Sequence, residues 1–204
     1  MKDFPKEVMP MKTTKAIHFY GDSLTAGYGA APSDGWISIL ARSHPDVTCY
    51  NHGECGAGLS DILNAAETIL FYPAPGETLF LMGGTNDIFS GVKRSTLSRC
   101  AEEGIRSFLG KIPFCAGIPI LPVKSAIAAG WLSQWNFETA CEDLLWYGDF
   151  LRRLGKEYGF PVIDFQKEFP QDERYYADGT HPNGKGYALF AEIAEKTLPF
   201  PPQA

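Results

Sequence analysis

Ser23 follows a short apolar run, residues 16–20, and closes a Gly-Asp-Ser turn before the next amphipathic stretch. A turn of this kind places a serine hydroxyl at the carboxyl edge of a sheet, in front of the backbone N–H groups that open a helix. Those N–H groups can stabilise negative charge on a substrate. Asp22 and, in a later segment, Asp87 are expected to cap helices rather than to react. Ser23 is therefore a candidate nucleophile.

A serine hydroxyl reacts well only when a base takes its proton, and the base needs a partner that fixes its tautomer. His181 supplies an imidazole in a segment that contains Gly and Pro, and Asp178 lies three residues before it. Such a segment can bend to bring the carboxylate to the ring. We therefore expect Ser23, His181 and Asp178 to form a catalytic triad.

The oxygen of a tetrahedral intermediate needs hydrogen-bond donors. Candidates are the Ser23 backbone N–H, a glycine N–H in the segment 51–58, and the side-chain amide of Asn86. Gly56 suits this role because a backbone without a Cβ can approach the substrate closely. Gly53 and Gly58 stay as alternatives to Gly56.

Five short apolar runs are predicted as strands, at residues 16–20, 47–51, 78–82, 117–121 and 161–165. Apolar residues with a 3.6-residue period predict helices within 59–70, 97–109, 140–158 and 187–198. This alternation implies an α/β protein with a parallel sheet and helices on both faces. The polar segments after the strands should then meet at one edge of the sheet, where ligands bind in such folds.

Length, charge and apolar content limit the classes of protein. The 204 residues predict one domain over 1–204, with 1–15 as a loose lead-in to the first strand. A net charge of −6 without charge blocks argues against nucleic acid and against anionic membranes. No apolar run reaches the length of a membrane span, and the lead-in lacks the apolar core of a secretion signal. We expect a cytoplasmic protein with no stable membrane association.

The cysteines point away from disulfides and metal. The five cysteines are an odd number with no C-x-x-C pair, which is typical of reduced thiols in the cytoplasm. No two Cys or His positions have the spacing of zinc ligands on adjacent loops. We expect neither a metal nor a cofactor.

Four blocks resemble, in order and spacing, the signature blocks of the SGNH (GDSL) hydrolases over residues 16 to about 195: Gly21-Asp22-Ser23-Leu24, Gly56, Gly84-Thr85-Asn86-Asp87 and Asp178-Gly179-Thr180-His181. The resemblance implies a three-layer α/β/α flavodoxin-like fold with a five-stranded parallel sheet. It also implies metal-free hydrolysis of esters or thioesters through an acyl-serine intermediate. By position, it makes Ser23 the nucleophile, and it makes Gly56 and Asn86 the oxyanion donors beside Asp178 and His181.

The second block departs from the family pattern. Cys55 stands where members often have serine, and Gly58 stands where they often have threonine. His52, close to this block, is a candidate for substrate contact. The aromatic segment 131–137 is expected either to flank the cleft and set specificity or to pack as a helix face.

Two functions are compatible with these patterns. The first is a serine esterase or acylhydrolase whose substrate is a small-molecule ester: a lipid, thioester, acetylated sugar or aryl ester. The alternative is a non-catalytic flavodoxin-like module that binds a small ligand or an anion with its Gly-rich loops. Such a module has no need for Asp178 and His181 at this spacing, so we favour the esterase.

Overall fold

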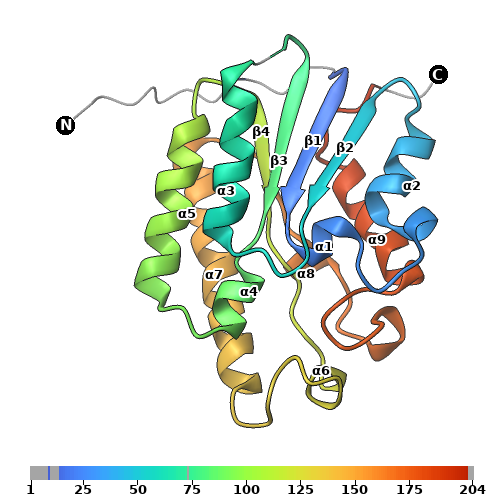
Figure 1. Cartoon of the computed structure of the whole chain (residues 1–204), viewed down its shortest axis with the longest axis vertical. Helices are drawn as coiled ribbons and strands as arrows, with labels where there is room; N and C mark the ends of the chain where they lie inside the picture. The colour runs from blue at the N-terminus through green and yellow to red at the C-terminus, as the bar shows by residue number, and fades with distance from the viewer. Residues whose placement is uncertain (1–8, 10–13, 73, 202–204) are drawn as a thin grey trace.

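One parallel sheet organises the chain (Figure 1). The computed structural model describes Met9 and residues 14–72 and 74–201, so most of the expected lead-in, 1–15, lies outside the described residues. The strand order is β2-β1-β3-β4-β5, and every neighbouring pair is parallel. The strands are β1 (Ala16–Gly21), β2 (Thr48–Gly53), β3 (Glu77–Met82), β4 (Phe114–Gly117) and β5 (Val162–Ile163).

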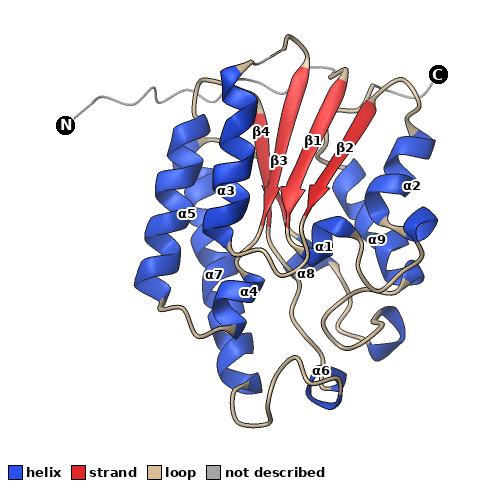
Figure 2. Ribbon diagram, viewed as in Figure 1, coloured by secondary structure: helices blue, strands red, loops and turns tan. Residues whose placement is uncertain are grey.

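Helices cover both faces of this sheet, so the expected three-layer α/β/α arrangement is confirmed (Figure 2). The longer helices α3, α5 and α7 lie on one face, and α2 and α9 lie on the other. The shorter helices α1, α4, α6 and α8 follow strands or lie in connections. The helices are α1 (Ser23–Ala26), α2 (Trp36–Ser43), α3 (Leu59–Glu67), α4 (Thr85–Phe89), α5 (Arg94–Phe108), α6 (Ser125–Ala128), α7 (Phe137–Tyr158), α8 (Phe165–Glu168) and α9 (Gly184–Glu195).

Alternation along the strands explains why both faces are buried. Phe80 packs into the layer of α2 and α9, whereas its neighbours Leu79 and Leu81 pack into the layer of α3, α5 and α7. Successive side chains of a strand point to opposite faces, so an apolar run without polar positions requires cover on both sides. Trp36 at the start of α2 is fully buried and donates its Nε1–H to the carbonyl of Leu24, which ties this layer to the turn after β1.

The last two strands differ most from the sequence prediction. The fourth strand is Phe114–Gly117 rather than 117–121, and only Val162–Ile163 of the predicted 161–165 is a strand. Pro119 and Pro122 have no N–H to donate, so the buried segment after β4 leaves the ladder. Phe165 instead begins α8, because the carboxylate of Asp164 accepts the Lys167 N–H as a helix cap.

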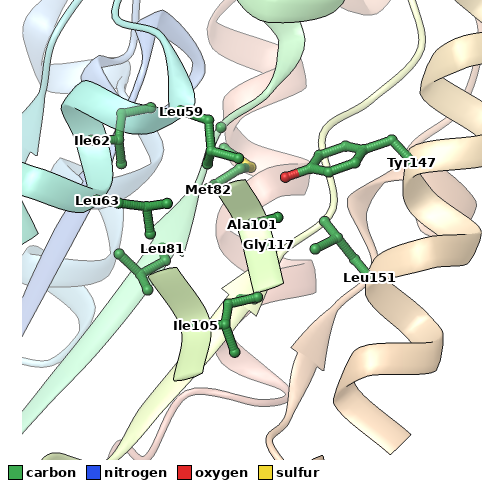
Figure 3. A pocket seen from close by; sticks show the side chains of 12 residues that line it. Leu59, Ile62, Leu63, Leu81, Met82, Ala101, Ile105, Gly117, Tyr147 and Leu151 are labelled. Atoms are coloured by element: carbon green, nitrogen blue, oxygen red, sulfur yellow. The ribbon is translucent and has the colours of Figure 1, made fainter. Parts of the chain in front are cut away.

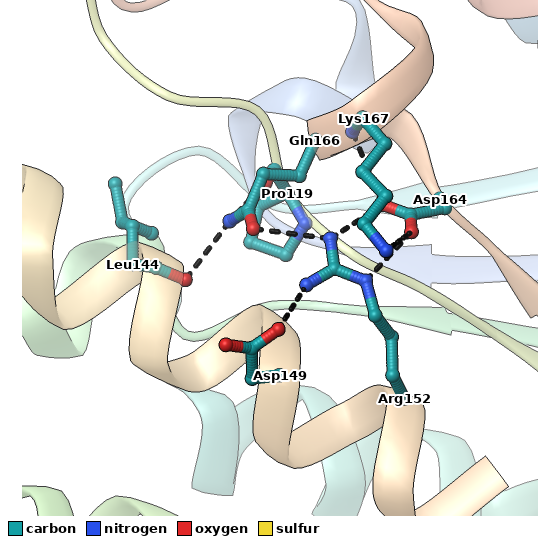
Figure 4. Close-up of polar contacts among 7 residues, drawn as sticks. All are labelled: Pro119, Leu144, Asp149, Arg152, Asp164, Gln166 and Lys167. Carbon is teal, nitrogen blue, oxygen red and sulfur yellow. Dashed lines mark hydrogen bonds and ion pairs between the residues drawn. The ribbon is translucent and has the colours of Figure 1, made fainter. Parts of the chain in front are cut away.

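A polar cluster joins α7 to the last strand and α8 (Figure 4). Arg152 holds both carboxylate oxygens of Asp164 at 2.7 and 2.8 Å and contacts the Gln166 amide oxygen at 3.2 Å. Gln166, which is buried, donates to the carbonyl of Leu144 at 2.9 Å. Asp149, three residues earlier in the same helix, supplies a further ion pair to Arg152. This cluster fixes the short β5 edge of the sheet to the longest helix.

Candidate active site at the carboxyl edge of the sheet

Ser23 is the first residue of α1, directly after the carboxyl end of β1. Asp22 caps this helix as expected, because its Oδ1 accepts the Leu24 N–H at 2.9 Å. Asp22 is fully buried, whereas Ser23 keeps 8% of its surface exposed and lines a pocket. The same turn therefore buries one polar side chain and presents the next to a ligand.

The three triad candidates form a continuous chain of contacts. Ser23 Oγ lies 2.8 Å from His181 Nε2, and His181 Nδ1 lies 2.8 Å from Asp178 Oδ2. His181 is 3% exposed, so its imidazole is shielded from bulk water. With Nδ1 protonated toward the carboxylate, Nε2 can accept the proton of the Ser23 hydroxyl. Residues 158 positions apart in the sequence are thus joined by one hydrogen bond.

The loop before His181 presents its carboxylate to the ring. Asp178 Oδ1 accepts the backbone N–H groups of Thr180 at 3.0 Å and of His181 at 2.8 Å. Partial burial raises the pKa of Asp178, but these hydrogen bonds and the one from the His181 ring outweigh it and leave the pKa below its usual value. Gly179 adopts φ +82°, and a Cβ there would lie 2.0 Å from the Ala126 backbone nitrogen in α6. Only glycine fits this approach.

The candidate oxyanion donors differ in whether their N–H groups already donate to an acceptor within the protein. Gly56 adopts φ +83° and lines the pocket, and no backbone acceptor within the described residues takes its N–H. The N–H of Gly53, by contrast, already donates to the Asn51 side chain at 2.9 Å. Gly58 lies at the start of α3 and does not line the pocket. Asn86 also lines it, and its amide donates one proton to the Ala57 carbonyl at 2.9 Å, which leaves the second for a ligand.

The pocket at Ser23 has a volume of about 70 Å³ and is mostly walled by apolar and aromatic groups. Tyr28, Phe89 and Trp131 contribute rings, and Cys55 lies exposed beside Gly56. The lining residues are Ser23, Leu24, Tyr28, Cys55, Gly56, Thr85, Asn86, Phe89, Trp131, Thr180 and His181.

Tyr28 is missing from the residues predicted from the sequence. Its ring lies 4.6 Å from the His181 ring. No local motif marks Tyr28, because it reaches the site only through the loop after α1. Trp131 was expected as one member of an aromatic segment, but the sequence did not indicate its hydrogen bond to Asp178 Oδ2, at 2.8 Å.

Other candidates lie away from the pocket. His52 does not line it and instead stacks on Tyr20 at 4.3 Å and contacts the His18 ring. Trp135 is 93% exposed, and Phe137 is buried in the layer of α3, α5 and α7. Asp87 does cap a helix, but the helix is α3, since its carboxylate accepts the Leu59 N–H at 2.8 Å.

Two findings concern the whole of the described chain. No helix among the described residues is long and apolar enough to cross a membrane. The same residues contain no group of three or more His, Cys, Asp or Glu side chains arranged to hold a metal ion.

The parallel sheet between two helix layers defines the class of protein, a three-layer α/β/α fold, and the Ser–His–Asp contacts lie at the carboxyl edge of its sheet. The model of the GDSL-like lipase/acylhydrolase family matches residues 19–189. The chain belongs to this family, as the four sequence blocks predicted, and the protein is accordingly a hydrolase.

Solved structures share the fold at low sequence identity. A member of the lipolytic G-D-S-L family from Veillonella parvula is 24% identical with a TM-score of 0.76, covering 89% of this chain and 96% of that one. A catalytic mutant of an acetylxylan esterase from Geobacillus stearothermophilus is 15% identical with a TM-score of 0.74, covering 95% and 98%. A lipase/acylhydrolase from Enterococcus faecalis is 22% identical with a TM-score of 0.72, covering 94% and 100%. No curated protein matches the chain.

Proposed function

We propose that this protein hydrolyses carboxylic esters through an acyl-serine intermediate on Ser23. The observation that carries the proposal is the 2.8 Å contact between Ser23 Oγ and His181 Nε2, backed by the 2.8 Å contact from His181 Nδ1 to Asp178. The Ser23 oxygen attacks the ester carbonyl carbon while its proton passes to Nε2. The imidazolium then protonates the departing alcohol oxygen as the carbon–oxygen bond breaks.

The second half of the reaction uses the same base. Water attacks the acyl carbon, His181 takes its proton, and the proton returns to Ser23 Oγ as the acid leaves. In both tetrahedral intermediates the oxyanion accepts from the Gly56 N–H, the Ser23 N–H and the Asn86 amide. Within the described part of the chain, the Gly56 N–H has no backbone acceptor and the Asn86 amide keeps one unused proton, and both observations support this assignment.

The size of the pocket favours short acyl groups. Its volume is about 70 Å³, and its lining includes Leu24, the loop residue Gly56, and Asn86 and Phe89 of α4. A separate apolar cavity lies beneath this edge of the sheet, where the Tyr147 hydroxyl points inward (Figure 3). That cavity measures about 20 Å³ and shares no lining residue with the pocket. A long acyl chain bound in the pocket therefore cannot extend into it.

An acetyl ester is therefore the first substrate to test. Two fold neighbours, an acetylxylan esterase and a carbohydrate acetylesterase family member from Sinorhizobium meliloti, favour the same substrate class. The exposed faces of Tyr28 and Trp131 provide aromatic walls on which the alcohol part of a substrate can stack.

The test compares p-nitrophenyl acetate hydrolysis by the wild type and by Ser23→Ala. We expect kcat/KM to fall by at least roughly a thousandfold, since the nucleophile is lost. Ser95→Ala, an exposed serine in the first turn of α5, is the matched control and should keep wild-type activity. Equal rates for the wild type and Ser23→Ala would refute the proposal.

A fluorophosphonate probe distinguishes the esterase from the binding module. An activated Ser23 should gain one covalent adduct, located by peptide mass spectrometry, and Ser23→Ala should gain none. A wild-type protein that stays unlabelled and turns over neither p-nitrophenyl acetate nor acetylated sugars would support the non-catalytic ligand-binding module.

A further inference from the structure

Trp131 contacts the triad, although its position in the sequence does not predict this contact. It lies between α6 and α7, and its Nε1–H donates to Asp178 Oδ2 at 2.8 Å. This is the oxygen that also faces His181 Nδ1 at 2.8 Å. One carboxylate oxygen is thus shared by the imidazole and the indole.

The carboxylate of Asp178 receives four N–H groups in this arrangement. Three of them come from its own loop: the backbone N–H groups of Thr180 and His181, and the ring of His181. Among the residues that the structure describes, Trp131 is the one donor from a distant segment, 47 positions away. The Asp178 side chain is only 20% exposed, and the indole both donates to Oδ2 and covers part of it from solvent.

The indole also encloses the catalytic base. Its ring lies 4.9 Å from the His181 ring at an angle of 72°, and Tyr28 lies 4.6 Å away on another side. The Tyr28 and Trp131 rings meet edge-on at 6.2 Å. The titratable groups that contact the imidazole are the Asp178 carboxylate, the Ser23 hydroxyl and the Tyr28 phenol. Two aromatic walls therefore limit how far the imidazole can turn.

The backbone of Trp131 is itself fixed to the site. Its N–H donates to the Ala126 carbonyl at 3.0 Å, and the Gly179 carbonyl accepts the Val123 N–H at 2.8 Å. The segment that carries the indole and the loop that carries the carboxylate are therefore both attached to the short α6 region. This shared attachment keeps the indole N–H within hydrogen-bonding distance of Asp178 Oδ2.

We propose that Trp131 is a positioning residue of the triad, which orients the Asp178 carboxylate and withdraws part of its negative charge from the imidazole. Its effect on turnover rests on the proposed esterase function, whereas its effect on His181 does not. Without the indole N–H, Asp178 Oδ2 carries more charge toward Nδ1 and stabilises the imidazolium more strongly. The acidic limb of the pH–rate profile should then move to higher pH.

The experiment compares Trp131→Phe, which keeps an aromatic wall and removes the N–H, with Trp131→Ala, which removes both. Trp135→Phe is the matched control, since Trp135 lies in the same segment and is 93% exposed. For Trp131→Phe on p-nitrophenyl acetate we expect kcat to fall roughly tenfold with KM nearly unchanged. Trp131→Ala should lose a similar factor in kcat and also raise KM. Trp135→Phe should match the wild type.

A second readout needs no turnover. The chain has four histidines, so the ring resonances of His181 can be assigned in an NMR pH titration by comparison with His181→Ala. In Trp131→Phe the pH at the titration midpoint of these resonances should rise by roughly 0.5 to 1 pH unit. A melting temperature for each variant shows whether the fold is kept.

The outcomes separate the two proposals. A raised midpoint together with the loss in kcat supports the positioning role. An unmoved midpoint in a folded Trp131→Phe overturns it, whatever happens to the rate. A raised midpoint in a protein whose Ser23→Ala variant is as active as the wild type supports the role of Trp131 and rejects Ser23 as the nucleophile.

Discussion

Asp22 and Ser23 are neighbours in the chain with opposite environments. Ser23 faces the pocket, whereas Asp22 is fully buried, and its Oδ2 has no hydrogen-bond partner among the described residues. Burial raises the pKa of Asp22 to about 7, and the nearby charge of Asp87 adds to this, although the hydrogen bond from Leu24 acts in the opposite direction. Asp22 therefore takes up a proton in the folded protein at a pH where an exposed carboxyl stays ionised.

Replacing this carboxyl by an amide should change how stability depends on pH. The unfolded chain ionises near its ordinary value of 3.8, so wild-type stability is fully present below that pH and declines as the pH rises toward 7. Asp22→Asn keeps an acceptor for the Leu24 N–H and cannot ionise. Its free energy of unfolding relative to the wild type should rise by roughly 2 kcal/mol between pH 5 and pH 8.

Urea unfolding at the two pH values measures this difference. Asp61→Asn, on the exposed surface of α3, is the control and should show no such change. The prediction would be contradicted if the free energy of unfolding of Asp22→Asn differed from that of the wild type by the same amount at pH 5 and at pH 8.

At the residue scale, the sequence predicts the parts of the site that lie in local motifs. Ser23, Asp178 and His181 can be recognised because a Gly-Asp-Ser turn and an Asp-x-x-His segment have local signatures. The structure brings these three residues together. Tyr28 and the indole N–H of Trp131 belong to no motif, and they reach the imidazole and the carboxylate only through long-range packing. No pattern of neighbouring residues encodes such contacts.

At the scale of elements, the short α6 acts as a platform for the loop that carries Asp178. A Cβ on Gly179 would lie 2.0 Å from the Ala126 backbone nitrogen and close to the Ser125 side chain. The Gly179 carbonyl accepts the Val123 N–H at 2.8 Å. The distance between carboxylate and imidazole therefore depends on how closely this loop packs on α6.

Gly179→Ala should move the loop that carries Asp178 away from α6. The substitution meets both a positive φ and a backbone atom, so the loop must move and the Asp178–His181 contact with it. We expect kcat/KM for p-nitrophenyl acetate to fall at least roughly tenfold, as small misplacements of catalytic groups cost that much or more. Gly159→Ala is the control, with φ +78° but open space around its Cβ, at the end of α7.

Gly159→Ala should lower stability by about 1 kcal/mol, as an alanine in a left-handed conformation does, and keep kcat/KM. Equal losses of activity in the two variants would show that backbone strain alone, rather than contact with α6, explains the effect.

Element boundaries were predicted least well where the backbone lacks donors. The segment after β4 is buried and apolar like a strand, and the Ile118 N–H still donates to the Ile163 carbonyl at 2.9 Å. Pro119 and Pro122 then end the pairing, which apolar content does not reveal. The helix Trp36–Ser43 was not predicted either, although it carries a fully buried tryptophan.

At the scale of the whole molecule, the sheet order and the two buried layers follow from the predicted alternation of strands and helices. The attachment of the last strand does not, because β5 has only two residues, Val162–Ile163. Arg152 compensates for this short ladder by binding Asp164 through two nitrogen–oxygen contacts. Side-chain bonds here take over part of the role that backbone pairing has elsewhere in the sheet.

Arg152→Met should therefore destabilise the molecule without altering the site. The arginine and Asp164 side chains are 19% and 20% exposed, so loss of the guanidinium leaves a partly buried carboxylate and the Gln166 amide oxygen without this partner. We expect the free energy of unfolding to fall by about 2 kcal/mol. Arg153→Met, on the exposed side of the same helix, should change it by less than about 0.5 kcal/mol.

Urea unfolding measures both variants, and kcat for p-nitrophenyl acetate at 25 °C should match the wild type in each. Equal stabilities for Arg152→Met and Arg153→Met would show that backbone packing alone holds the β5 edge.

The Thr14 N–H donates to the Pro199 carbonyl at 3.3 Å, so the first and last parts of the described fold lie side by side. They lie at the amino end of the strands, away from α1 and α4, which contribute residues to the pocket (Figure 1). In a variant cut back to residues 14–199, a short peptide bridge between these two positions would close the polypeptide into a ring without crossing the pocket at Ser23. By the same geometry, a bead or surface coupled near either position would hold the enzyme with its open side facing the solution.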